Sequence, residues 1–195
     1  MKLLLWLLLF LFLAWGIPYL RIFAKRVCLL IRLKNAVKKH GWQLRGTHRL
    51  WWLAGNNGKT CDFHLYTGEH LYSVKLFSVK YHKSALILSD GHRYRFRYYL
   101  GLIGQAASAR IPIDGTVRRM PQYNFRAGIL QKWDTAYPHS ILLIHPVCIE
   151  ICDSPKHDKE IPRGAGDRYY DMQIYSLRRF LARAELDDFS HAETF

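Results

Sequence analysis

The first twenty residues are the most apolar part of the chain. Residues 3–15 read LLLWLLLFLFLAW without a polar side chain, and residues 16–20 extend the run to eighteen. A helix needs about twenty apolar residues to cross the hydrocarbon core of a bilayer, so this run is at the short end of the range. Trp6 and Tyr19 stand near its two ends, where aromatic side chains favour the membrane interfaces. The pattern predicts a transmembrane anchor over residues 1–20.

The pattern of the next twenty residues is helical and two-sided. Apolar residues recur three and four positions apart and form one stripe, made of Leu20, Phe23, Ala24, Val27, Leu30 and Ile31. Polar residues fall on the other side, among them Arg21, Lys25, Arg32, Asn35 and Lys39. His40 and Gly41 provide a stop signal for the helix. Residues 21–40 are therefore predicted to form a basic amphipathic juxtamembrane helix.

Residues 41–195 are predicted to form a single α+β globular domain. From about residue 48 to residue 100, short apolar runs alternate with Asn-Gly, Thr-Gly and Asp-Gly turns, which is typical of an antiparallel β-meander. Residues 141–151 have the composition of a buried strand. Near the end of the chain, Ser176 is expected to cap a C-terminal helix. The buried stripe of that helix would comprise Leu177, Phe180, Leu181 and Ala184.

The positive charge is concentrated at the N-terminal end of the chain. Of the net charge of +14, residues 1–61 contribute eleven Lys and Arg and no acid, and the first carboxylate is Asp62. Bases packed beside an apolar run fit anionic lipid head groups. A nucleic-acid module, the alternative partner, would more naturally spread its bases over the folded face that grips phosphates. The candidate lipid-binding residues are Arg21, Lys25, Arg26, Lys38 and Lys39.

The flanking charges also predict the orientation of the chain. Seven bases follow the apolar run and one precedes it, so the positive-inside rule places the C-terminal domain of a single-pass cell-membrane protein in the cytoplasm. The alternative is a cleaved signal peptide and a secreted domain that begins near Ile17. The four cysteines, Cys28, Cys61, Cys148 and Cys152, lack the spacing of a disulfide or zinc framework. They are interpreted as buried thiols in a reducing compartment.

Arginines and aromatic residues alternate strictly between residues 93 and 98. Arg93, Arg95 and Arg97 would share one face of a strand, and the intervening Tyr and Phe residues would share the other. The arginines form a candidate binding face for a partner protein or a polyanion. The alternative is an ordinary half-buried strand whose arginines are simply solvated.

A short pattern around Asp62 resembles a known nuclease core. Asp62 precedes Tyr72-Ser73-Val74-Lys75 by a suitable interval, with a helix upstream, so residues 21–88 resemble the front half of the PD-(D/E)xK restriction-endonuclease-like core in order and spacing. The resemblance implies carboxylates that bind Mg²⁺ and a lysine that steadies the attacking water. The catalytic residues would be Asp62, Glu69 and Lys75. Ser73 occupies the place of the second carboxylate, so Glu69 would have to substitute for it.

Two functions from different classes follow from these observations. The first is a membrane-anchored binding domain without a cofactor, whose partners are anionic lipid head groups and an unknown protein. The second is a membrane-tethered, degenerate nuclease-like domain that acts on nucleic acid with Mg²⁺. The binding domain is the interpretation that the charge distribution favours.

Overall fold

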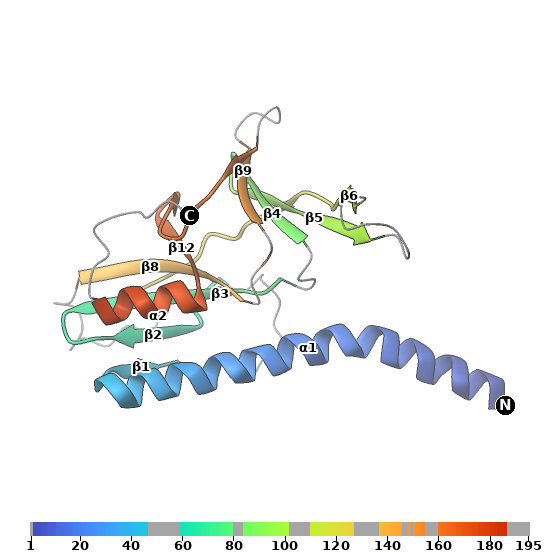
Figure 1. Ribbon diagram of the computed structural model, residues 1–195, viewed down its shortest axis with the longest axis horizontal. Coiled ribbons are helices and arrows are strands. Elements are labelled where there is room, and N and C mark those ends of the chain that lie inside the picture. The colour runs from blue at the N-terminus through green and yellow to red at the C-terminus, as the bar shows by residue number, and fades with distance from the viewer. Residues whose placement is uncertain are drawn as a thin grey trace.

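The computed structural model describes residues 2–46, 59–79, 84–101, 110–126, 137–145, 148, 150–154 and 160–186 (Figure 1). These residues form two helices, α1 (Lys2–His40) and α2 (Leu177–Leu186), and the strands of two mixed sheets. The predicted α+β class is confirmed, and so is the C-terminal helix. Ser176 caps α2, because its Oγ accepts a hydrogen bond from the backbone N–H of Arg179 at 3.4 Å.

The first sheet carries the residues of the resemblance described above. Its strand order is β1-β2-β3-β8-β12-β11, in which β1, β2 and β3 are antiparallel and β3, β8 and β12 are parallel. Val74 pairs with Phe63 on one side and with Ile141 on the other. The strands are β1 (Gln43–Arg45), β2 (Phe63–Tyr66), β3 (His70–Phe77), β8 (Tyr137–Ile144), β11 (Arg168–Tyr169) and β12 (Met172–Ser176).

The second sheet also has six strands and also joins antiparallel pairs to a parallel pair. Its order is β10-β9-β4-β5-β6, with β4 antiparallel to β5 and parallel to β9, and β7 pairs with β5. The strands are β4 (Ser84–Ser89), β5 (Arg93–Gly101), β6 (Arg110–Asp114), β7 (Arg118–Arg119), β9 (Glu150–Ser154) and β10 (Ile161–Pro162). The predicted single meander is therefore divided between two sheets. The expected strand over residues 141–151 is likewise two elements, the end of β8 and the start of β9.

The elements stack in three layers, with the first sheet in the middle (Figure 1). Helices α1 and α2 cover one face of this sheet, where Leu29, Leu33 and Phe180 meet Val74 and Ile141 in one core cluster. The second sheet covers the other face. A second cluster fills the space between the sheets and includes Phe77, Leu86, Leu88, Leu142, Ile144 and Ile174. The middle sheet is thus buried on both faces, which is why the paired ends of β3 and β8, Leu76-Phe77 and Leu143-Ile144, are apolar on both.

Helix α1 overturns the predicted membrane anchor. The predicted anchor of residues 1–20 and the amphipathic helix of residues 21–40 are one continuous helix from Lys2 to His40. Within the described part of the chain, no helix combines the length and apolar character required to cross a membrane. The apolar run continues into a charged half that packs on the domain through Leu29, Leu30 and Leu33. The predictions of a transmembrane anchor, of single-pass localisation in the cell membrane and of a membrane-tethered enzyme are therefore wrong.

The end of α1 follows the predicted stop signal. Gly41 adopts a φ of +71°, a left-handed conformation that costs glycine little. The backbone N–H of Trp42 then reaches back to the carbonyl of Val37 at 3.2 Å, as in a Schellman motif. Both Trp42 and Val37 pack against the helix-side core, which fixes the angle at which the chain leaves the helix.

Candidate functional site

Five polar residues form a cluster on the face of the first sheet that points toward the second sheet. We call Cys61, Asp62, His64, Ser73 and Lys75 the inter-sheet polar cluster. Their neighbours in β2 and β3 belong to the helix-side core, and side chains alternate between the two faces of a strand. Cys61, His64, Ser73 and Lys75 are each 3% exposed. Polar groups buried to this extent require partners, which are other members of the cluster and nearby backbone groups.

Asp62 and Lys75 form an ion pair in which the lysine is buried and the acid is partly buried. Lys75 Nζ lies 3.2 Å from Asp62 Oδ1 and also donates to the carbonyl of Thr60 at 3.1 Å. The second carboxylate oxygen, Oδ2, accepts a hydrogen bond from the backbone N–H of Leu76 at 2.7 Å. Lys75 Nζ lies 5.5 Å from the ring centroid of Tyr123. Burial, followed by the influence of Tyr94 and Asp62, raises the pKa of Tyr123, so this phenol remains protonated near neutral pH.

The other three members of the cluster form a second hydrogen-bonded chain. Cys61 Sγ lies 3.1 Å from His64 Nε2, and His64 Nδ1 lies 3.0 Å from Ser73 Oγ. The sequence analysis did not identify this arrangement. The sequence contains little indication of it. Cys61 and His64 are only three residues apart, but Ser73 is nine residues beyond His64. The antiparallel pairing of β2 with β3 places Ser73 directly opposite His64.

The cluster does not fit the magnesium site that the resemblance implies. Glu69 lies exposed in the turn at the other end of the β2–β3 hairpin, six residues along the strand from Lys75, or about 20 Å at 3.3 Å per residue. Ser73 interacts with His64, and both oxygens of Asp62 have hydrogen-bond donors inside the protein. Among the residues that the structure describes, no three His, Cys, Asp or Glu side chains converge on a metal position. The structure brings Asp62 and Lys75 together and keeps Glu69 apart.

The predicted arginine face of β5 is largely occupied by acids of the same chain. Arg97 binds Asp114 through Nε at 2.7 Å and Nη2 at 3.3 Å, and Glu160 through Nη1 at 2.7 Å. Arg95 lies 3.6 Å from Asp114 and 3.5 Å from Glu160. The hydrogen bonds from Arg97 lower the pKa of Asp114 and keep it ionised. Of the three predicted arginines, Arg93 alone is exposed, whereas the Arg95 and Arg97 side chains are 19% and 22% exposed.

The predicted lipid-binding residues lie on α1, and the structure separates one of them from the rest. Arg21, Lys25, Lys38 and Lys39 are exposed. Arg26 is 5% exposed and donates to Ser78 Oγ through Nε at 3.2 Å and Nη2 at 2.9 Å. Burial lowers the pKa of Arg26, against an opposing influence of Asp62. The sequence could have indicated this burial. Arg26 precedes Leu30 by four residues and Leu33 by seven, and residues with this spacing share one side of a helix.

Three further exposed bases extend the surface of α1. Arg32 and Lys34 lie on the helix, and Arg45 lies just beyond it in β1. We call the seven exposed bases Arg21, Lys25, Arg32, Lys34, Lys38, Lys39 and Arg45 the α1 basic face. Glu185 of α2 contacts this face at one end, where its Oε1 lies 3.9 Å from Lys39 and 3.1 Å from His40.

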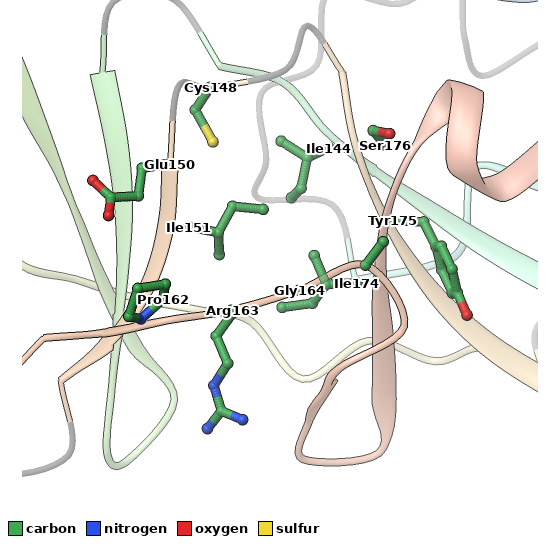
Figure 2. Close-up of a pocket in the computed structure, with 11 residues that line it drawn as sticks. Ile144, Cys148, Glu150, Ile151, Pro162, Arg163, Gly164, Ile174, Tyr175 and Ser176 are labelled. Carbon is green, nitrogen blue, oxygen red and sulfur yellow. The ribbon is translucent and has the colours of Figure 1, made fainter. Parts of the chain in front are cut away.

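An apolar cavity of about 290 Å³ lies between the two sheets. Figure 2 shows Ile144, Ile151 and Ile174 gathered in it, with the Cys148 thiol directed toward Ile151 and the Arg163 guanidinium pointing away. Burial in this apolar environment raises the pKa of Cys148 to about 11. Cys148 is therefore a protonated thiol near neutral pH.

Comparisons with known proteins found no relative that could assign either site. No protein-family model, no curated protein and no solved structure matches this chain.

Proposed function

We propose that this protein is a binding domain for anionic lipid surfaces, and that the α1 basic face is its contact surface. The observation that carries the proposal is the separation of the helix into two sides. Leu29, Leu30 and Leu33 are buried against the sheet, and the bases point to solvent. The first 61 residues contain no acid that could neutralise these bases along the sequence.

The geometry of the helix supports a flat target. Successive residues of an α-helix are about 100° apart, so Arg21, Lys25, Arg32 and Lys39 lie within roughly 40° of one another. At 1.5 Å per residue this line of bases spans about 27 Å. A straight line of exposed cations of that length matches an extended anionic surface. Each base near such a surface contributes about 1 kcal/mol to binding.

Exposed apolar side chains on the same helix favour lipid over nucleic acid. Trp6, Phe10 and Leu20 are 70%, 69% and 68% exposed, and Ile31 is 52% exposed. Aromatic and aliphatic residues next to a basic face are typical of helices that lie in the plane of a bilayer surface. Phosphate recognition by itself gives no reason to expose them. The proposal concerns binding to the surface and does not require a helix that crosses the bilayer.

The test measures binding of the full chain to vesicles. Vesicles of phosphatidylcholine alone are compared with vesicles that also contain phosphatidylserine, by co-sedimentation at low and high salt. We expect binding that requires phosphatidylserine and weakens with salt. The triple variant Lys25→Gln, Arg32→Gln and Lys39→Gln removes three charges, so its affinity should fall by about 3 kcal/mol, or roughly a hundredfold.

A matched control removes the same charge from a different face. Arg93, Arg118 and Arg119 are exposed on the second sheet, which the first sheet separates from α1. Their combined change to Gln should leave vesicle binding nearly unchanged. If the two triple variants lose equal affinity for the vesicles, binding depends only on the net charge, and the α1 basic face is not the contact surface. Binding to duplex DNA without binding to anionic vesicles would replace lipid with nucleic acid as the partner.

A further inference from the structure

The strongest unassigned feature of the molecule is the hydrogen-bonded chain from Cys61 through His64 to Ser73. It lies in the inter-sheet polar cluster, away from the α1 basic face, and it does not depend on the proposed lipid binding. A thiol, an imidazole and a hydroxyl in this order reproduce a general arrangement of activated nucleophiles: the nucleophile contacts a base, and a third group orients the base. The two distances of 3.1 Å and 3.0 Å are within reach of proton transfer and hydrogen bonding.

One tautomer of His64, stabilised by Ser73, leaves the nitrogen that faces Cys61 able to act as the base. When Nδ1–H donates to Ser73 Oγ, the other nitrogen, Nε2, has a lone pair directed at the thiol of Cys61. Nε2 can then take the proton of Cys61. The result is a thiolate facing an imidazolium, with the second N–H of the ring still bonded to Ser73. Ser73 is thus a positioning residue, and it acts through His64.

We propose that Cys61 is a peroxide-reactive thiol that His64 activates and that oxidation converts to a sulfenic acid. The thiolate sulfur attacks one oxygen of a hydroperoxide, a sulfur–oxygen bond forms and the oxygen–oxygen bond breaks. Sulfur is oxidised by two electrons and the peroxide is reduced. The leaving alkoxide or hydroxide receives its proton from the His64 imidazolium, which gives an alcohol or water and returns neutral His64.

The other buried cysteines of the chain provide an internal comparison. Cys61, Cys148 and Cys152 are 3%, 5% and 2% exposed, so all three thiols are buried, and Cys148 also lines the cavity between the sheets. Burial raises the pKa of Cys148 to about 11, and burial together with Glu150 raises that of Cys152 to about 12. Both are almost fully protonated near neutral pH and react slowly. A difference in rate between Cys61 and these two thiols therefore reports on His64.

The experiment treats the folded full chain with hydrogen peroxide and dimedone, a reagent that traps sulfenic acids. The Cys28→Ser background removes the exposed cysteine. Peptide mass spectrometry then gives the rate of adduct formation at each remaining cysteine. We expect Cys61 to react at least about tenfold faster than Cys148 and Cys152 near pH 7. Equal rates at the three cysteines would overturn the proposal.

Three variants separate activation from a merely structural role. His64→Gln keeps a polar side chain but cannot take the proton, and it should lower the rate at Cys61 to that of Cys148. Ser73→Ala should lower the rate several-fold, and Ser73→Thr should restore it because the hydroxyl returns. An unchanged rate in a His64→Gln protein that unfolds at the wild-type temperature would refute the role of His64.

If these variants do not fold, the proposal can still be tested on the protein with His64 and Ser73 intact, through the pH dependence of the rate at each cysteine. Between about pH 6 and pH 9, the rate at Cys148 and Cys152 should rise about tenfold per pH unit, because their thiolates form only at higher pH. The rate at Cys61 should rise less steeply over the same range, because His64 takes the proton of the thiol within the hydrogen-bonded pair. A parallel rise at all three cysteines would contradict the proposal.

Discussion

The ion pair between Asp62 and Lys75 permits a quantitative test of what the inter-sheet polar cluster does. In the structure this pair is a buried structural element: Asp62 accepts from Lys75 Nζ and from the backbone N–H of Leu76. The Lys75 side chain is 4% exposed and that of Asp62 is 18% exposed. Removing the acid therefore leaves an ammonium group without its counter-ion in the protein interior.

The expected cost follows from these contacts. Breaking a buried ion pair on one side typically costs about 3–5 kcal/mol, and an unsatisfied buried N–H costs about 1–3 kcal/mol. Because Asp62 has some contact with solvent, we expect Asp62→Ala to lower the free energy of unfolding by about 3–4 kcal/mol. Lys75→Met leaves Asp62 with the Leu76 bond and partial hydration, so it should cost about 1–2 kcal/mol.

The assay is equilibrium unfolding in urea, followed by far-ultraviolet circular dichroism, on the two single variants and the double variant. The double variant should lose about 2 kcal/mol less than the sum of the single losses, because the pair is removed as a unit. Glu69→Ala, a change in the exposed turn of the same hairpin, is the control and should stay within about 0.5 kcal/mol of wild type. The reasoning is refuted if Asp62→Ala costs less than about 1 kcal/mol, or if the two single losses simply add.

Three further outcomes are expected from contacts of α1 and of β5. Burial, with Lys25, Arg26 and Arg32 nearby, lowers the pKa of His145, whose Nε2–H donates to the carbonyl of Lys25 at 3.0 Å. The unfolded chain then binds the proton more readily, so stability is complete above about pH 6.5 and falls below it. Thermal unfolding should show this slope in wild type and lose part of it in His145→Gln. Ser78→Ala removes one acceptor of the buried Arg26 guanidinium and should cost about 1–3 kcal/mol in urea unfolding, whereas Ser78→Thr should cost less. The pKa of Asp114 is lowered in the folded protein, so ionised Asp114 stabilises the fold above about pH 4. This stabilisation is lost as the pH falls through the pKa of the folded state. In Asp114→Asn the melting temperature should therefore fall less steeply at acid pH.

The parts of the fold that the sequence predicted are those decided by local chemistry. The end of α1 depends mainly on Gly41, because few other residues adopt a φ of +71° without strain. The β4–β5 hairpin follows from the Asp90-Gly91 turn, and Gly91 has a φ of +70°. In both cases the glycine that determines the turn lies next in the sequence to the helix or the hairpin that it ends or forms.

The parts that could not be predicted depend on pairings across long stretches of chain. β3 pairs with β8 more than sixty residues later, and nothing within either strand specifies the other as its partner. The same pairing divides the expected meander between two sheets. The candidate site has the same property, since Ser73 reaches His64 only through the register of β2 with β3. The pattern of Asp62 and Lys75 was visible because the two residues belong to one hairpin.

The continuity of α1 changes how the chain can be divided. A cut at residue 41, which the sequence pattern recommends as the start of the domain, would remove Leu29, Leu30 and Leu33 from the core. The helix is one rod of about 58 Å, at 1.5 Å per residue, and its C-terminal half packs in the core of the protein. In Figure 1 its outer part projects well beyond the sheets. A force or torque applied to that outer part would therefore act on the packing of the C-terminal half against Val74, which lies in β3 between Ser73 and Lys75.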